Sequence, residues 1–345
     1  MKKHSFYAEI YSFKIRKGNG NMEIKSIIKE IKSKMEQRGG FRNVFFVACG
    51  GSQAAIYTGY YLLRSESKTI ATEIMNSDEF VHTRPASVDD RTIVVLCSLK
   101  ATKDTVNAVH VANSLGAITI AMTGAPDTEM ATAGQYVVLY SNGDAQDYSH
   151  SNQSMSLRIG FELLHQFENY CLYDEAMDSF QHINKIIAES KESLRGKAEQ
   201  FANKFSEDTV FHVLSSGPMY STGYSMTNCH FMEMQWKYAI CTHSGEFFHG
   251  PFETTDENLA IILFMSTGRT RALDERALRF IKKYAKHYLV LDAKETGLEN
   301  YINPQISEFF NSIVMIPIER YFVSQMAKVR KHSMDMRRYM WKVEY

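Results

Sequence analysis

Short, continuous apolar runs alternate along this chain with longer stretches of helical periodicity. Runs of strand length occupy residues 44–49, 92–97 and 117–122. Such runs are typical of parallel strands buried on both faces. Helical patterns lie between them, at residues 53–63 and 103–114, and an isoleucine face precedes them at Ile24, Ile27, Ile28 and Ile31. Strands that alternate with helices predict an α/β fold built on doubly wound parallel sheets.

The second half of the chain repeats the pattern of the first. Val-Phe-Phe-Val at 44–47 returns as Val-Phe-His-Val at 210–213, and Thr-Gly-Tyr at 58–60 returns at 222–224. Ser-Asp-Glu-Phe at 77–80 returns as Ser-Gly-Glu-Phe at 244–247, an offset of 167 residues, and Ser98 before its helix matches Ser266. Similar matches in one order, at nearly one offset, indicate duplication of an α/β unit.

The duplication predicts two tandem domains, which we expect at residues 22–185 and 186–345. Residues 1–21 lack a clear period and end in a Gly-Asn-Gly-Asn loop signal, so we interpret them as an N-terminal extension. The lysine-rich stretch at 178–204 is expected to be a helical connector.

Composition narrows the function classes. The 345 residues are 44% hydrophobic and 23% charged, with 39 basic and 39 acidic side chains, so the formal net charge is zero. Binding of nucleic acid through an overall positive charge of the chain is therefore not expected. No apolar run is long enough to span a bilayer. Five cysteines without C-x-x-C spacing argue against a disulfide framework and favour a reducing, cytoplasmic setting.

Two strand-to-helix loops are candidates for holding a small anion. Gly-Gly-Ser at 50–52 follows the first strand, and Ser-Leu-Lys-Ala-Thr at 98–102 follows the second. Glycine lets the backbone approach a ligand closely, and the first N–H groups of a helix lack partners within it. Neighbouring parallel strands would bring both loops to one crevice. Neither loop matches a nucleotide-binding motif, and each could also be an ordinary connection capped by a serine.

The second half contains a candidate acid–base pair. Glu233 lies among bulky apolar residues in a predicted helix at 220–238, where partial desolvation favours a base. His249 is bracketed by glycine and proline in a loop and can exchange a proton near neutral pH. A solvent-facing glutamate and a packed loop histidine remain the plain alternatives. No cluster has metal-ligand spacing, so neither a metal nor a cofactor is expected.

At these residues the chain resembles the two-domain members of the sugar isomerase (SIS) family. The resemblance is carried by Ala-Cys-Gly-Gly-Ser at 48–52 and Ser-Gly-Glu-Phe-Phe-His-Gly-Pro at 244–251. From about Met22 onward the chain is more similar still to deglycases of 6-phosphorylated Amadori compounds, and its ending at 337–345 is similar to theirs. One loop departs from the family pattern, usually Ser-x-Ser-Gly-x-Thr. Residues 98–102 lack the glycine and are one residue shorter.

The resemblance implies a role for several residues. Glu233 would be the base that moves a proton between C1 and C2, His249 would assist ring opening or protonate the leaving amine, and Lys342 would reach the sugar. In relatives the histidine crosses a dimer interface, which implies a homodimer or a higher homo-oligomer. The sugar phosphate would be bound by Gly51, Ser52, Gln53, Ser98, Lys100 and Thr102.

The implied function is a deglycase that cleaves a 6-phosphorylated sugar–amino acid adduct into a hexose 6-phosphate and the free amino acid. Two alternatives remain open. One is an aldose–ketose phosphosugar isomerase that uses the same acid–base pair, and the other is a noncatalytic sugar-phosphate-binding regulator. The presence of both Glu233 and His249 argues against the regulator, and no nucleic-acid-binding motif is evident.

Overall fold

The computed structural model describes residues 15–17, 20–141 and 146–344. The chain divides into two compact units, Met1–Met177 (unit 1) and Asp178–Tyr345 (unit 2), and each is described here by itself. The domain boundary at 185/186 stays a prediction. Most of the predicted N-terminal extension, residues 1–14 and 18–19, lies outside the described residues.

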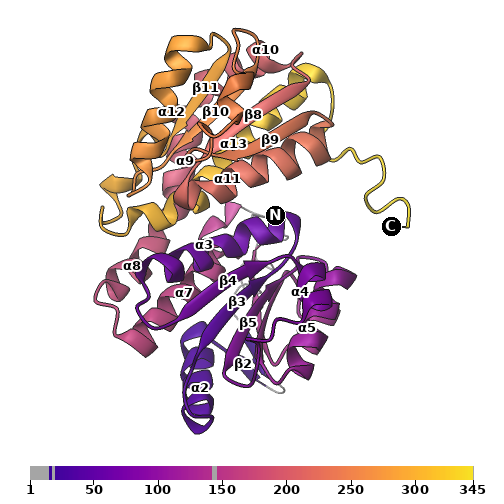
Figure 1. Cartoon of the computed structure of the whole chain (residues 1–345), viewed down its shortest axis with the longest axis vertical. Helices are drawn as coiled ribbons and strands as arrows, with labels where there is room; N and C mark the ends of the chain where they lie inside the picture. The colour runs from indigo at the N-terminus through magenta and orange to yellow at the C-terminus, as the bar shows by residue number, and fades with distance from the viewer. Residues whose placement is uncertain (1–14, 18–19, 142–145, 345) are drawn as a thin grey trace, which may run out of the picture. The chain divides into compact units, whose positions relative to one another are not determined.

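Unit 1 is built on a five-stranded parallel sheet in the order β4-β3-β5-β6-β7, of which Figure 1 labels β4, β3 and β5. Its strands are β3 (Asn43–Val47), β4 (Ala71–Met75), β5 (Thr92–Cys97), β6 (Ile118–Thr123) and β7 (Tyr136–Leu139). The strands β3, β5 and β6 are buried along their whole length. These are the three strands that the continuous apolar runs predict, because a strand covered on both faces has no polar side to show.

The helices of unit 1 connect these strands. They are α2 (Ile24–Gln37), α3 (Gly50–Glu66), α4 (Ser77–Thr83), α5 (Lys103–Ser114), α6 (Glu129–Ala133), α7 (Asn152–Glu168) and α8 (Tyr173–Ser179), with the short 3-10 turn η2 (Tyr148–His150). A small antiparallel pair, β1 (Ile15–Lys17) and β2 (Gly20–Met22), precedes α2.

Two helices of unit 1 pack unusually close together. The amide of Gly59 on α3 donates to the hydroxyl of Ser156 on α7 at 3.3 Å. A Cβ added at Gly59 would lie 2.5 Å from the Ser156 carbonyl oxygen, so the glycine is what permits the contact. The second glycine of the repeat, Gly223, is equally confined, because its Cβ would lie 2.4 Å from the Ser215 hydroxyl.

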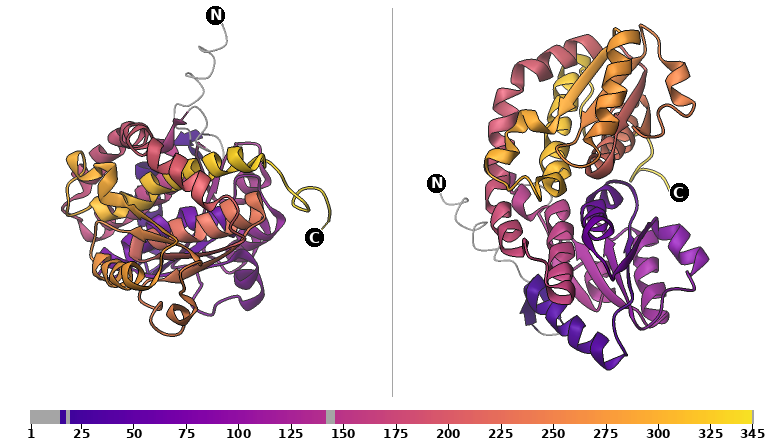
Figure 2. Two further views of the ribbon diagram at one scale, coloured as in Figure 1. Left: turned by 90° about the horizontal axis from the view of Figure 1, so that it is seen from above. Right: turned by 60° about the vertical axis from the view of Figure 1, so that its left-hand side comes forward.

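Unit 2 contains a four-stranded parallel sheet in the order β11-β10-β8-β9. Its strands are β8 (Val210–Ser215), β9 (Tyr238–His243), β10 (Ala260–Met265) and β11 (Tyr288–Asp292). The α- and π-helices are α9 (Ile183–Ser193), α10 (Arg195–Phe205), α11 (Tyr220–Tyr224), the π-helix η5 (Ser225–Met234), α12 (Arg271–Tyr284) and α13 (Ser307–Arg330). Short 3-10 turns lie at η3 (Phe180–His182), η4 (Gly217–Met219), η6 (Pro251–Thr254), η7 (Ala293–Thr296) and η8 (Leu298–Asn300). After α13 the chain continues as an irregular tail (Figure 2).

The two sheets share one topology. In unit 1 the first three strands of the sheet lie in the order β4-β3-β5, with β6 beside β5; in unit 2 the order is β9-β8-β10, with β11 beside β10. The glycines at the ends of β3 and β8, Gly50 and Gly217, both adopt left-handed backbone conformations, with φ of 56° and 51°. Strand order and turn conformation therefore support the duplication that the sequence indicates, and β7 extends the sheet of unit 1 alone.

Some local predictions were wrong. The short edge strand β4 and the strand β7 were missed. The helix expected at 220–238 ends at Met234 and becomes a π-helix from Ser225, since the chain from Tyr238 pairs with β8 as β9.

The connector expected at 178–204 is helical, as α9 and α10 show. Within the described residues, no helix has both the length and the apolar character needed to cross a bilayer.

Candidate functional site

The first candidate anion loop of unit 1 is the opening turn of α3. Gly50 is already the first helical residue, so the predicted Gly-Gly-Ser turn is part of the helix. Its left-handed conformation is readily adopted only by glycine and turns the chain from β3 into the helix axis. Gly51 is exposed, and Ser52 and Gln53 are half-buried in the same turn. Backbone amides and the Ser52 hydroxyl thus lie at the positive end of a 17-residue helix.

Ser52 joins this turn to the second loop. Its hydroxyl hydrogen-bonds to the Cys97 thiol and to the Tyr140 phenol, and Asn152 also hydrogen-bonds to Tyr140. Cys97 is the last residue of β5 and directly precedes Ser98. Burial raises the pKa of Cys97 to about 12 and holds the pKa of Tyr140 well above its usual range, so both groups are neutral at neutral pH. The structure therefore connects the two predicted loops through the uncharged side chains of Cys97 and Tyr140, which we call the floor of the site.

The second loop is held by a chain of hydroxyl groups. The buried Ser98 hydroxyl accepts the Thr102 amide at 2.9 Å and lies 3.2 Å from the Thr102 hydroxyl. The chain continues from Thr102 to Thr105 at 3.3 Å and from Thr105 to Ser77 at 2.9 Å. Thr102 and Lys100 are exposed. A loop that is supported by uncharged hydroxyls and carries an exposed cation, Lys100, is suited to binding an anionic group.

Ala101 adds a strained residue to this loop. Its φ is 51°, in the left-handed region that favours glycine. The family pattern has a glycine in this loop, and this chain has none there. Backbone strain of this kind persists only when surrounding contacts hold it. The hydroxyl bonds of Ser98 and Thr102 on either side of Ala101 provide such contacts.

Glu233 lies in unit 2, near the end of the π-helix η5. Its carboxylate forms an ion pair with Arg337, with Oε1 and Nη2 at 2.7 Å. Both side chains are largely buried, with 21% of Glu233 and 9% of Arg337 exposed. The other terminal nitrogen of Arg337 donates to the carbonyls of Met334 and Met336. π-Helical turns occur often at functional sites, and this one ends at a carboxylate that the C-terminal tail holds in position.

The other two predicted catalytic residues, Lys342 and His249, differ in how they are connected to Glu233. Lys342 is exposed, and its ammonium donates to the Arg337 carbonyl. His249 is exposed in the turn after β9, where its amide donates to the Glu246 carbonyl at 2.9 Å. Within the described residues no hydrogen bond or ion pair joins the His249 ring to Glu233. The structure therefore links Lys342 to Glu233 through Arg337 and leaves His249 apart.

Sequence reasoning missed Arg337 as a site residue. The signal was present, because Arg337 opens the C-terminal ending that resembles the deglycases. The resemblance implies Lys342 instead as the residue of the tail that reaches the sugar. The hydroxyl groups of Ser77 and Thr105 were also missed, although Ser77 begins one of the repeated motifs.

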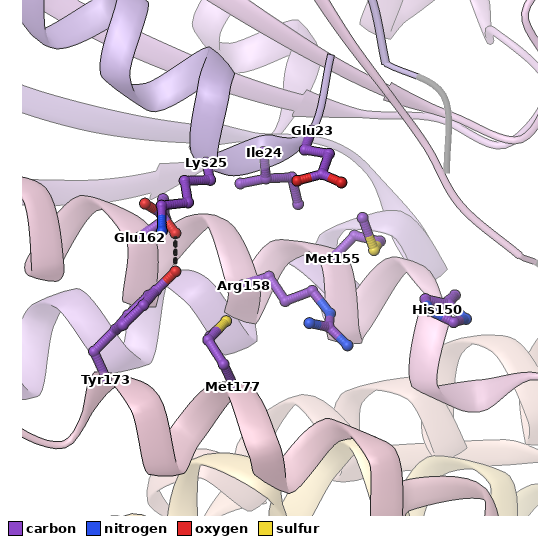
Figure 3. Close-up of a pocket in the computed structure, with 9 residues that line it drawn as sticks. All are labelled: Glu23, Ile24, Lys25, His150, Met155, Arg158, Glu162, Tyr173 and Met177. Atoms are coloured by element: carbon purple, nitrogen blue, oxygen red, sulfur yellow. Dashed lines mark hydrogen bonds between the residues drawn. The ribbon is translucent and has the colours of Figure 1, made fainter. Parts of the chain in front are cut away.

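A separate cavity of about 260 Å³ lies in unit 1 between α2, α7 and α8 (Figure 3). It contains none of the predicted site residues. Figure 3 shows the Tyr173 hydroxyl bonded to Glu162 at one end of the cavity and Arg158 nearer the other. The residues that line it are Glu23, Ile24, Lys25, His150, Met155, Arg158, Glu162, Tyr173 and Met177. Among the described residues, no three histidine, cysteine, aspartate or glutamate side chains are grouped as a metal ion would require.

Comparison with known proteins adds to this geometry. Residues 41–161 match the SIS domain. The fructosamine deglycase FrlB of Bacillus subtilis is 34% identical over 326 residues, which is 94% of this chain and 98% of that protein. The fructoselysine 6-phosphate deglycase of Escherichia coli is 22% identical over 86% of this chain and 84% of its own. A crystal structure from Bacillus subtilis, described as that of a candidate phosphosugar isomerase, superimposes with a TM-score of 0.88 at 34% identity, covering 93% of this chain and 97% of that one.

Proposed function

The chain belongs to the SIS-domain family and has a fructosamine deglycase as a relative along nearly its whole length, and from this we propose that it is a deglycase of a 6-phosphorylated Amadori compound. The substrate has a ketone at C2 and a secondary amine at C1. The products are a hexose 6-phosphate and a free amino acid. The observation that carries the proposal is the 34% identity with a deglycase across 94% of the chain.

In this proposal the loops of unit 1 bind the phosphate group. The amides at the start of α3, the hydroxyls of Ser52, Ser98 and Thr102, and the Lys100 ammonium supply donors and positive charge. Gly51 lets the backbone come close, and Gln53 supplies a further amide. The neutral floor of Cys97 and Tyr140 supports this assignment, because it presents no negative charge to the phosphate.

Glu233 is the proposed base. It removes a proton from C1 while the C2 oxygen gains one, which gives an enolamine. Delivery of a proton to C2 with loss of the nitrogen-bound proton then yields a C1 imine that keeps the C2 hydroxyl, and one water molecule hydrolyses the imine to the aldehyde and the amine. The ion pair with Arg337 supports the role of Glu233, because it keeps a carboxylate in one orientation inside a largely buried site.

His249 and Lys342 complete the proposal. His249 supplies a proton to the ring oxygen or to the departing nitrogen, and Lys342 contacts the sugar. We propose that the active form is at least a homodimer, with His249 supplied by a partner copy. The exposure of His249 supports this, because its ring is accessible to a second chain. We also propose a cytoplasmic location, since a charged phosphate ester does not cross a bilayer unaided.

The experiment incubates the purified protein with a fructosamine 6-phosphate and follows release of the free amine and of hexose 6-phosphate. Wild-type protein is expected to release both in equal amounts. Glu233→Gln is expected to lower kcat about a hundred- to ten-thousandfold, the range that a positioned base contributes.

The matched control is Glu275→Gln. Glu275 is also a glutamate of unit 2 paired with an arginine, Arg271, at 3.1 Å, and its loss is expected to leave turnover unchanged. Near-normal turnover by the Glu233 variant would remove the base assignment. Conversion of fructose 6-phosphate to an aldose phosphate without any amine release from the adduct would favour the isomerase instead.

A further inference from the structure

Unit 2 contains a second copy of the loop that precedes α5. Residues 266–270 follow β10 and lead into α12, as residues 98–102 follow β5 and lead into α5. Both loops have five residues, begin with a buried serine and end with a threonine at the N-cap of the helix. Each also carries one cation, Lys100 in unit 1 and Arg269 in unit 2. The repeat therefore extends to the candidate phosphate loop itself.

The copy in unit 2 already holds an anion. Glu308, in the first turn of α13, is only 4% exposed. Its Oε2 accepts the Arg269 amide at 3.1 Å, and its Oε1 lies 2.6 Å from Nε of Arg269. A Cβ added at Gly268 would lie 1.9 Å from Oε2 of Glu308. The carboxylate therefore rests directly on the loop backbone, in a space that only glycine leaves open.

A second carboxylate lies beneath the same loop. Oδ1 of Asp274 accepts the hydroxyls of Ser216 and Ser244 at 2.7 and 2.6 Å, and its Oδ2 accepts the Ser266 amide at 3.2 Å. Ser244 corresponds to Ser77 in the repeat, and Ser77 bonds to the hydroxyl of Thr105. The repeated serine thus bonds to a carboxylate in unit 2 and to a neutral hydroxyl in unit 1.

The start of the packed helix differs in the same sense. In unit 1, α7 begins with a Ser151 cap and Asn152, both uncharged, and Asn152 bonds to Tyr140 beneath the first loop. In unit 2, α13 begins with Ser307 and Glu308. The negative charge at the loop of unit 2 therefore comes from within the chain.

We propose that Glu308 is an internal anion that occupies the unit 2 counterpart of the phosphate loop, so that each chain binds one sugar phosphate rather than two. Removing the Glu308 carboxylate takes away the anion that the Arg269 amide and guanidinium contact, and opens a second site for a phosphate group. The identity of the ligand in unit 1 rests on the proposed function, whereas the occupation of the unit 2 loop by Glu308 does not.

The test counts bound inorganic phosphate by isothermal titration, with chloride at equal ionic strength as the reference. Wild-type chain is expected to bind about one phosphate, and Glu308→Ala about two. In a Ser52→Ala/Ser98→Ala background the counts are expected to fall to none and about one. Glu295→Ala is the matched control, because it removes a carboxylate of unit 2 that pairs with Lys197 outside the loop.

Each outcome separates the two proposals. A folded Glu308→Ala chain that gains no phosphate overturns the internal-anion proposal, whatever unit 1 does. Wild-type binding that survives loss of Ser52 and Ser98 contradicts the loop assignment in the proposed function and leaves the count for unit 2 intact. If Glu308→Ala does not fold, Glu308→Ser decides, since serine removes the charge and also clears the space that the carboxylate fills on the loop. A second phosphate there supports the proposal, and its absence overturns it.

Discussion

The two units share one strand order and one five-residue loop, at residues 98–102 in unit 1 and 266–270 in unit 2. They differ in the charge of the side chains that support this loop. In unit 1 the loop rests on hydroxyls, from Ser98 through Thr105 to Ser77. In unit 2 the amides of the corresponding loop bond to the carboxylates of Glu308 and Asp274. A duplicated scaffold thus keeps its backbone donors in both copies, and a few acidic substitutions decide which copy can accept an external anion.

A second difference concerns the helix after the first strand of each repeat. In unit 1 this is α3, a regular helix of 17 residues that presents its first turn to the candidate anion site. In unit 2 the chain passes through α11 into the 10-residue π-helix η5, which carries Glu233. The helical segment after the first strand therefore offers amides at its start in unit 1 and carries a carboxylate near its end, held by Arg337, in unit 2.

The largest effect is expected when the carboxylate under the loop of unit 2 is removed. Asp274→Ala deprives two serine hydroxyls and one amide of their buried acceptor, so we expect a loss of about 3 kcal/mol in the free energy of unfolding. Thr105→Ala removes the hydroxyl that bonds to the repeated serine of unit 1, Ser77, and should cost about 1 kcal/mol. Urea unfolding at neutral pH measures both. Equal losses in the free energy of unfolding would contradict the difference between the loop of unit 2, which is supported by carboxylates, and the loop of unit 1, which is supported by hydroxyls.

The repeated first strand gives a pH-dependent prediction. His212 is 4% exposed, and burial lowers its pKa to about 4, whereas unfolded histidine titrates near 6.5. Between these values the unfolded chain binds more protons, so stability is lost as the pH falls from about 6.5 to about 4. Replacing it by the residue found at the matching position of unit 1, Phe46, should abolish this loss, which amounts to up to about 3 kcal/mol.

The measurement for His212→Phe is urea unfolding at pH 7.5 and at pH 5. Relative to wild type, the variant should gain stability at the lower pH, although at both pH values it loses the hydrogen bond, 2.8 Å long, between the ring Nε2 and the Thr242 hydroxyl. Other buried acids titrate in both proteins alike, so the difference isolates the histidine. A variant that differs from wild type by the same amount at both pH values would show that His212 is not the group responsible.

The loop serines should separate binding from structure. Ser98→Ala removes a hydroxyl from the candidate phosphate loop, so we expect KM for a phosphorylated ketosamine to rise about ten- to a hundredfold, with kcat changed much less. Its counterpart Ser266 accepts the Gly268 amide at 2.9 Å, and Ser266→Ala should leave KM within about twofold of wild type. Steady-state kinetics of the two variants decides whether only the loop of unit 1 binds substrate.

The smallest effect concerns the strained residue of the unit 1 loop. Ala101→Gly relieves a left-handed φ of 51°. Because the gain from relief is offset by the greater freedom of glycine in the unfolded chain, we expect a net stabilisation below about 1 kcal/mol. Thermal unfolding of the variant checks this, and a clear destabilisation would mean that the Ala101 methyl makes packing contacts that outweigh the strain.

Local sequence patterns were sufficient for the buried framework. The apolar run at 92–97 and the helical pattern at 103–114 coincide with β5 and α5. Both were predictable because a strand buried on both faces gives a continuous apolar run and an amphipathic helix repeats its apolar residues about every 3.6 positions. The edge strand β4, with an exposed glutamate in its middle, has no such signature and was missed. The predicted helix at 220–238 ran too far because its apolar residues suit either a helix or a strand.

The amino-acid sequence alone determined the α/β class, the duplication and the candidate loops, since each rests on residues close together in the chain or on a fixed offset between two halves. Only the tertiary structure decided how the loops are filled. Glu308 reaches Arg269, and Arg337 reaches Glu233, across long stretches of chain. Such pairings depend on how helices pack and where a tail returns, and packing in three dimensions leaves no local period to detect.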